Sequence, residues 1–333
     1  MTAIAAPTTP QLTVAAGRRT LLCMGEPMVE FVREPGPGPK RYLRGFGGDV
    51  SNAAIAAARQ GAEVAFFTAL GNDEFGRDIL DLWADEGVDA SAVLLREDAS
   101  TAIYFVDPHA EERRFTYFRA GSAASRVTAA DVPEAAVRAA AVLHLSAISQ
   151  AIGTGPAEAG FHAMRIARAA GTLVSYDTNL RLKLWSLDTA RATTEAALRL
   201  ADIALPSLDD ARILTGLDDA DAIVDAHLAL GPGIVVLKCG ADGAVIAAGG
   251  ERRRIPAAPA RPVDSTGAGD AFGGAFLARF IETGDPFAAG HYAAAVAAAT
   301  VSGFGAVEPI PRRAEVEAML GAAPTELDAA APT

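Results

Sequence analysis

The sequence is poor in cysteine, aromatic residues and basic side chains. Its 333 residues include two cysteines, Cys23 and Cys239, which stand far apart and form no Cys-x-x-Cys pair. A disulfide framework of the kind found in small secreted proteins is therefore not expected, whereas free thiols in a reducing compartment are. The five histidines show no metal-ligand spacing with these cysteines, so a structural zinc site has little support.

Long apolar runs are also missing, and residues 1–17 are not expected to form a signal peptide. No apolar run reaches the roughly 18–20 residues that a membrane-spanning helix needs. Residues 1–17 are rich in Ala, Thr and Pro and do not begin with the basic region of a signal peptide. We therefore expect a cytoplasmic protein with no membrane partner and with a disordered N-terminal tail at residues 1–19.

Basic side chains are outnumbered by acidic ones. There are 29 Lys and Arg against 41 Asp and Glu, which gives a formal net charge of −12. A nucleic-acid partner needs clustered Lys and Arg, so none is expected. A small anionic ligand remains compatible with this charge, because a few arginines can dominate the field inside a cleft.

What the sequence does have is an alternation of short apolar runs and segments with helical spacing. This alternation predicts βαβ units, and hence a doubly wound, mostly parallel sheet with helices on both faces. We expect one such domain at residues 20–312. The apolar runs lie at 21–24, 64–68, 142–145, 173–176, 203–205 and 234–237, and the clearest helical segments at 49–59, 157–170 and 190–200.

Two regions interrupt this alternation. Residues 28–32 with 41–46, and 101–106 with 113–118, look like strand pairs with no helix between them, the second pair being joined by a polar turn at 107–112. They predict a small β lid inserted at about 28–46 and 100–120, and lids commonly exclude water from the chemistry below. Exposed lid edges also predict a homo-oligomer. Residues 313–333 are expected to form a C-terminal helix and a frayed tail.

A glycine-rich segment at 264–274 carries the clearest chemical signal. Gly267 and Gly269 allow backbone N–H groups to converge on an anion at the start of a helix. Asp270 follows directly, where it would repel a resting phosphate but could take a proton from an attacking hydroxyl during phosphoryl transfer. The alternative is that Asp270 only favours the N-terminus of the helix.

A second glycine-rich segment lies at 45–52. Consecutive glycines before a helix permit close approach of the backbone to a ligand, and Asp49 and Asn52 offer polar contacts to hydroxyl groups. Taken alone, the segment fits equally well a tight turn with Asp49 capping the helix.

The two segments together resemble the ribokinase-like sugar kinases of the phosphofructokinase-B family. The resemblance rests on Gly-Gly-Asp-Val-Ser-Asn-Ala-Ala at 47–54 and Asp-Ser-Thr-Gly-Ala-Gly-Asp-Ala-Phe at 264–272, and extends over about 21–311. It implies a doubly wound sheet with a small β lid over the sugar. It also implies that Asp270 is the catalytic base and that Gly267, Ala268 and Gly269 form the anion hole.

Two further segments concern the sugar. Asn179 and Arg181 follow the apolar run at 173–176, at the edge of the sheet where ligands bind in doubly wound folds. Tyr117 and Arg119 end the second lid hairpin, and Tyr104 lies on its partner strand. Two arginines are more than a neutral sugar needs, although structural salt bridges on an acidic surface are the alternative.

Residues 117–125 and 177–185 are similar to the 2-keto-3-deoxygluconate kinase subgroup of the family. The implied reaction transfers phosphate from ATP to the primary hydroxyl of an acid sugar, which Asp270 deprotonates. The alternatives are a fructokinase or other neutral-sugar kinase, and a non-catalytic sugar sensor. The residues implied near the acid sugar are Gly48, Asp49, Asn52, Tyr104, Tyr117, Arg119, Arg181 and Asp270.

The nucleotide side is implied by the same family. Lys238, Gly240 and Gly243 resemble an adenosine-contact loop, while Asn179, Arg181 and Thr266 join the anion hole near the phosphates. Ser207 and Asp210 replace the Asn and Glu that help to organise Mg²⁺ in the family, so Asp210 would act through water. For Asp210, simple charge at a helix N-terminus fits equally well. Relatives also suggest a monovalent cation such as K⁺ near Asp264.

Overall fold

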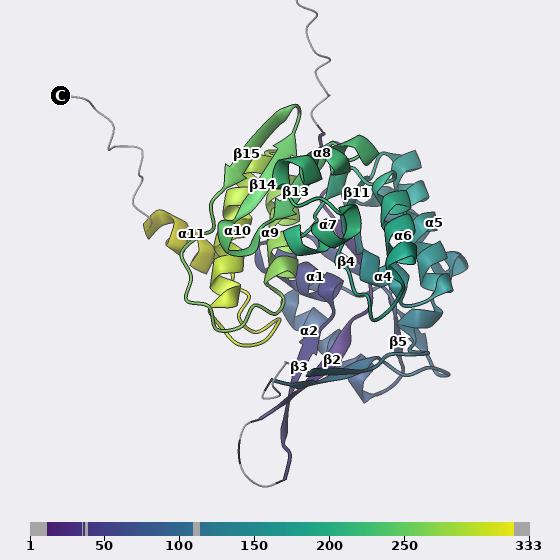
Figure 1. Cartoon of the computed structure of the whole chain (residues 1–333). Helices are drawn as coiled ribbons and strands as arrows, with labels where there is room; N and C mark the ends of the chain where they lie inside the picture. Colours follow the sequence, from purple (N-terminus) through teal and green to yellow (C-terminus); the bar gives the residue numbers. More distant parts are fainter. Residues whose placement is uncertain (1–11, 35, 37–38, 109–113, 323–333) are drawn as a thin grey trace, which may run out of the picture.

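The computed structural model describes residues 12–34, 36, 39–108 and 114–322 (Figure 1). Its centre is a nine-stranded sheet. Seven neighbouring strands are parallel, and β14 and β15 continue the sheet as an antiparallel hairpin at one edge. In spatial order the strands are β15 (Glu251–Ile255), β14 (Ala244–Ala248), β13 (Ile234–Lys238), β12 (Ile203–Ala204), β11 (Leu173–Asp177), β10 (Val142–Ser146), β1 (Leu21–Met24), β4 (Val64–Phe67) and β6 (Val88–Asp89).

Helices cover both faces of this sheet, because successive side chains of each buried strand point to opposite sides. Leu21 and Cys23 of β1 join the core under α1, α2, α9 and α10, whereas Leu22 and Met24 join the core under α5, α6 and α8. The helices are α1 (Asp49–Arg59), α2 (Glu74–Glu86), α3 (Glu134–Ala139), α4 (Ala147–Ala151), α5 (Thr154–Ala170), α6 (Leu187–Leu198), α7 (Leu208–Thr215), α8 (Ala220–Leu230), α9 (Ala268–Thr283), α10 (Pro286–Val301) and α11 (Arg313–Ala322), with short 3₁₀ turns at Ala124–Arg126, Ala129–Asp131 and Gly240–Asp242.

A smaller sheet projects from this body, at the lower side of Figure 1. Its strands are β3 (Tyr42–Gly47), β2 (Met28–Arg33), β8 (Ile103–Asp107) and β9 (Arg114–Phe118), in that spatial order. The two predicted antiparallel pairs are present, and a parallel pairing of β2 with β8 joins them into one lid sheet. A further small sheet pairs β5 (Ala69–Gly71) with β7 (Leu94–Arg96).

The predicted fold class is confirmed: the sheet is mostly parallel, doubly covered and accompanied by a small β lid. Helix α1 has the predicted bounds, 49–59. The sequence analysis did not identify β15, because four of its five residues are exposed and charged (Glu-Arg-Arg-Arg) and it lies at a sheet edge. It also missed β6, which has only two residues.

Residues 12–19 of the predicted N-terminal tail are held against the body. Arg18 donates hydrogen bonds to Ala170 O and to Thr172 Oγ1. Residues 1–11 and 323–333 of the two predicted tails, and residues 109–113 of the predicted lid turn, lie outside the described residues. Within the described part of the chain, no helix combines the length and apolar character needed to cross a membrane.

Candidate active site

The site is built where helices α1 and α9 cross. A Cβ atom on Gly274 would lie 2.0 Å from Ala53 O, so a glycine is needed for the two helices to approach this closely. The crossing brings Asp270, in the first turn of α9, to Asn52 of α1. Asn52 Nδ2 donates a hydrogen bond of 2.9 Å to Asp270 Oδ2. Two residues that are far apart in the sequence thus meet because one glycine has no side chain.

Asp270 belongs to a pocket that contains three carboxylates, here named the carboxylate pocket. Each carboxylate accepts one hydrogen bond from a neighbouring side chain. Besides the Asn52 bond to Asp270, Asn179 Nδ2 donates to Asp49 Oδ2 at 3.0 Å, and Lys238 Nζ lies 2.6 Å from Asp177 Oδ2. The lining residues are Asp49, Val50, Ala53, His144, Ser146, Asp177, Asp270 and Gly273.

The surroundings of Asp270 make its carboxyl hard to ionise. Burial, followed by the negative charge of Asp49, raises the pKa of Asp270 to about 7. The hydrogen bond from Asn52 and the positive charge of Lys238 act in the opposite direction. A carboxylate with a pKa near the working pH suits a general base.

The N-terminus of α9 offers an anion cradle next to this base. Gly267 caps the helix with a φ of +75°, and a Cβ there would lie 2.7 Å from Ala306 O. A Cβ on Gly269 would lie 3.8 Å from Lys238 Nζ, so a cationic group stands beside the cradle. The Ala268 N–H already donates to Ser265 O at 3.3 Å, so the start of the helix, its dipole and the lysine are what fit the phosphates of a nucleotide.

The lid brings Tyr104, Tyr117 and Arg119 together. The Tyr117 ring stacks on Tyr104, with ring centroids 5.5 Å apart, and the Arg119 guanidinium lies 5.7 Å from the centre of the Tyr117 ring. Arg119 Nη2 is also 2.5 Å from Glu26 Oε2, and the exposed side-chain fractions of the pair are 11% and 1%. The sequence analysis left open whether Arg119 makes a structural salt bridge, and the structure contains one.

Glu26 lies at the hinge between β1 and the lid, and it ties several lid connections together. Ser122 Oγ donates to Glu26 Oε1 at 2.6 Å, and a Cβ on Gly48 would lie 2.5 Å from Glu26 O. Burial raises the pKa of Glu26, while Arg119 and Ser122 oppose that rise. Another buried acid, Glu30, accepts a hydrogen bond from the Tyr104 hydroxyl, so Tyr104 is partly committed to the lid itself.

Arg181 differs from Arg119 in having no carboxylate in ion-pair contact among the described residues. It is exposed, and its Nη1 donates to the neighbouring Leu180 O at 2.8 Å. Its positive charge lowers the pKa of Tyr117 and of Asp210, although burial leaves both pKa values raised. Arg181 is therefore the arginine near Tyr117 that is available to an anion.

The residues predicted for Mg²⁺ have local partners. Ser207 caps α7 by accepting from Asp210 N at 3.2 Å, and Asp210 Oδ2 accepts from Leu180 N at 3.1 Å. Within the ranges that the structure describes, no group of three or more His, Cys, Asp or Glu side chains is arranged to hold a metal ion. Mg²⁺ near Asp210 stays a prediction.

The predicted cation and adenosine positions lie around the same edge. Asp264 Oδ1 accepts from the N–H and the hydroxyl of Thr266, and its Oδ2 accepts from Gly305 N at 3.2 Å. Gly240 and Gly243 both have positive φ in the turn after β13. The monovalent cation and the adenosine contact stay predictions.

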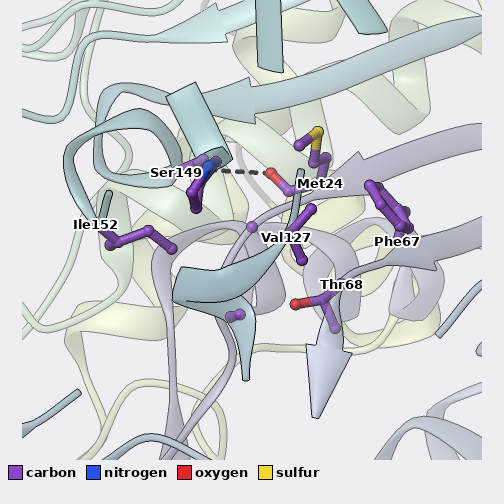
Figure 2. A pocket seen from close by; sticks show the side chains of 9 residues that line it. Met24, Phe67, Thr68, Val127, Ser149 and Ile152 are labelled. Carbon is purple, nitrogen blue, oxygen red and sulfur yellow. Dashed lines mark hydrogen bonds between the residues drawn. The ribbon is translucent and has the colours of Figure 1, made fainter. Parts of the chain in front are cut away.

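A separate apolar pocket lies beneath the hinge (Figure 2). Ser149 Oγ donates to Met24 O at 3.0 Å, and Thr68 Oγ1 is buried without a hydrogen-bond partner among the described residues. No charged side chain lines it, so it offers no chemistry for group transfer. The lining residues are Met24, Gly25, Phe67, Thr68, Ala124, Val127, Ser149, Ile152 and Pro156.

Three residues of the site were not singled out from the sequence. Glu26 and Asp177 stand at or just after the carboxyl ends of β1 and β11, a position that could have flagged them. The third is His144, whose Nδ1 lies 3.1 Å from Ser175 Oγ in the core and which also lines the carboxylate pocket.

Comparison with known proteins agrees with this geometry. A family model described as pfkB family carbohydrate kinase matches residues 19–313. Fructokinase-1 from Zea mays is 34% identical over 319 residues, which cover 91% of this chain and 98% of the relative. A 2-dehydro-3-deoxygluconokinase from Thermoproteus tenax is 34% identical over 312 residues, covering 91% and 94%. An Escherichia coli protein assigned as a ribokinase II, solved with ATP and Mg²⁺, has a TM-score of 0.83 at 26% identity and covers 91% of this chain and 99% of its own.

Proposed function

The chain belongs to the pfkB family of carbohydrate kinases, and we propose that it transfers a phosphoryl group from ATP to the primary hydroxyl of 2-dehydro-3-deoxy-D-gluconate. The observation that carries the choice of an acid sugar is Arg181. It lies near Tyr117, a residue expected at the sugar, and is paired with no carboxylate among the described residues. A neutral sugar gives no reason for such a charge.

In this proposal the chain's own residues divide the work. Asp270 accepts the proton of the primary hydroxyl, while Asn52 holds the carboxylate in place. The N–H groups at Gly267 to Gly269 and the Lys238 ammonium bind the phosphates. ATP supplies the phosphoryl group, and Mg²⁺ balances charge on it. The lid excludes water, so that the sugar rather than water is phosphorylated.

The second candidate is a neutral-sugar kinase such as a fructokinase. It is favoured by one observation, the neutralisation of Arg119 by Glu26, which removes one of the two predicted charges for a sugar carboxylate. The 34% identity to a fructokinase supports it equally. A non-catalytic sugar sensor does not need a general base, so the raised pKa of Asp270 makes this hypothesis the weakest of the three.

An ADP-release assay with both sugars decides between the candidates. We expect kcat/KM to be about 10- to 10²-fold higher for the acid sugar, since a charge-assisted bond contributes about 1.5–3 kcal/mol. Faster turnover of fructose would assign the neutral-sugar reaction instead. If neither acid sugars nor neutral hexoses support ATP turnover, the non-catalytic sugar sensor becomes the favoured function.

An Arg181→Met variant refines the assay. If Arg181 binds the sugar carboxylate, the variant loses activity with the acid sugar and keeps any activity with fructose. Equal loss with both sugars would place Arg181 at the phosphates, the other role expected for it. The cytoplasmic location and a homo-oligomer formed through the lid edges β3 and β9 remain part of the proposal.

A further inference from the structure

The carboxylate pocket holds more negative charge than its hydrogen bonds neutralise. Lys238 pairs with Asp177, and no other cation lines the pocket among the described residues. Asp49 and Asp270 are each held by a neutral amide, from Asn179 and Asn52 respectively. Two acids thus share a pocket with one amide donor apiece, and the negative charge of Asp49 opposes the ionisation of Asp270.

The geometry of α1 places both the Asn52 amide and the Asp49 carboxylate near Asp270. Asp49 and Asn52 are three residues apart and so lie on the same face of α1, which the Gly274 contact presses against α9. Asn52 Nδ2 is committed to Asp270, and Asn52 Oδ1 is buried without a hydrogen-bond partner among the described residues. Asn52 is therefore committed to the base through Nδ2 and keeps Oδ1 as an acceptor, so its expected role in sugar binding stays a prediction.

We propose that Asn52 and Asp49 are positioning residues that set the proton affinity of Asp270 in opposite directions. Asn52 favours the ionised carboxylate by donating to it, and Asp49 opposes ionisation as a second negative charge in the same pocket. The effect on Asp270 does not depend on the reaction, whereas its consequence for catalysis rests on Asp270 being the base of the proposed function, whichever sugar is phosphorylated.

The other charged or titratable groups that face Asp270 do not remove this opposition. From β11, Asp177 adds negative charge, which its ion pair with Lys238 of β13 largely offsets. From β10, His144 lines the same pocket, but burial lowers its pKa to about 4, so it is neutral at pH 7. Burial and Asp49 are the two largest influences that raise the pKa of Asp270.

The test is the pH dependence of kcat/KM for whichever sugar the enzyme turns over, since its acidic limb reports the base of the free enzyme. The wild-type limb is expected near pH 7. Asp49→Asn should move it down by about one pH unit, and Asn52→Leu should move it up by about as much. Asp81→Asn removes one exposed charge on α2, away from the pocket, and should not move it.

Opposite shifts in the two variants support the proposal, and shifts in the same direction, or activity losses with an unmoved limb, overturn it. A merely structural role would lower kcat without moving the limb. Asp49→Asn keeps the shape of the side chain and an acceptor for Asn179, so this variant keeps the test decisive even if Asn52→Leu folds poorly.

A second measurement needs no substrate. The carboxyl carbon of Asp270 can be titrated by NMR in ¹³C-aspartate-labelled protein, with Asp270→Asn identifying the signal. The Asp270 midpoint should fall in Asp49→Asn and rise in Asn52→Leu. If no sugar is turned over but these shifts appear, the proposed function fails and this inference stands. If a sugar is turned over and the midpoints do not move, the proposed function stands and this inference fails.

Discussion

Two parts of the site hold buried acids in different ways. We call the carboxylate pocket between α1 and α9 the floor, and the lid sheet with the hinge at Glu26 the roof. On the floor, α1 and α9 press Asp270 into a pocket with Asp49 and Asp177, and among the described residues the side chains that donate to Asp49 and Asp270 are neutral amides. In the lid, the buried Glu26 meets the charge of Arg119 directly, at 2.5 Å. The floor therefore raises the pKa of the Asp270 carboxyl toward the working pH, which suits a general base. The roof instead pairs the Glu26 carboxylate with a cation, which stabilises the hinge.

The comparison separates chemistry from selection. The floor is built from backbone contacts such as that of Gly274 with Ala53, which leave little freedom to its geometry. In the proposed function it acts on the sugar hydroxyl and the ATP phosphate, which are common to all substrates of a sugar kinase. The groups that distinguish an acid sugar from a neutral sugar are there proposed to contact Tyr117, Arg119 and Arg181 instead. We expect variants in the floor to lower kcat/KM for all sugars equally. Variants among the residues near the sugar should instead change the ratio of kcat/KM between sugars.

The largest effect is expected from Asp270→Asn. This change keeps the shape of the floor and removes the base, so kcat should fall by about 10²–10⁴ with every sugar. Single-turnover kinetics measures the chemical step directly. An unchanged kcat would show that Asp270 is not the base. The floor would then not be the part of the site that performs the chemistry.

The same variant should be more stable than the wild type at high pH. The folded-state pKa of Asp270, about 7, lies above the unfolded value near 3.9, so its ionisation destabilises the fold increasingly as pH rises from about 4 to about 7. Thermal unfolding should show Asp270→Asn to be more stable at pH 8 by on the order of 1–4 kcal/mol, with the difference gone below pH 4. A variant less stable at pH 8 would show that the pocket does not oppose ionisation.

A smaller effect is expected from Arg119→Leu in the roof. The variant leaves Glu26 buried without its cation, which should cost about 3 kcal/mol of folding stability. KM for the sugar should rise by less than in Arg181→Met, because Glu26 already neutralises Arg119, while KM for ATP stays the same.

The double variant Glu26→Gln with Arg119→Leu is the matched control. It removes both charges, so it should recover most of the stability but not the affinity for the sugar. If the sugar affinity returns together with the stability, Arg119 acts only as part of the hinge.

The smallest effect is expected from Gly274→Ala on the floor. The new Cβ would collide with Ala53 O and push α1 from α9, at a cost of about 1–3 kcal/mol. We expect kcat to fall by about tenfold, because Asn52 would no longer hold Asp270. Gly273→Ala adds the same methyl group one residue earlier, at an ordinary 3.4 Å from Leu205 Cδ1, and should leave stability nearly unchanged. Equal losses in the two variants would mean that the close approach of α1 and α9 is not what matters.

How far the sequence led can be judged from particular residues. The start of α1 at Asp49 and the placing of Asp270 in the first turn of α9 followed from glycine spacing and apolar periodicity, which are local properties. The Asn52–Asp270 bond joins residues 218 positions apart and depends on a helix crossing that no local pattern describes. The pairing of Glu26 with Arg119 likewise depends on how the lid folds back on the body. The elements with clear apolar or glycine patterns were predictable, and the contacts between elements were not.

The ratio of kcat/KM for 2-dehydro-3-deoxy-D-gluconate to that for fructose tests most directly whether chemistry and substrate selection reside in different residues. It should be measured in the wild type, in Asp270→Asn and in Arg181→Met. We predict that Asp270→Asn lowers both values and leaves the ratio unchanged, whereas Arg181→Met lowers the ratio by about tenfold or more. An unchanged ratio in Arg181→Met, or a ratio altered as much in Asp270→Asn, would contradict the account.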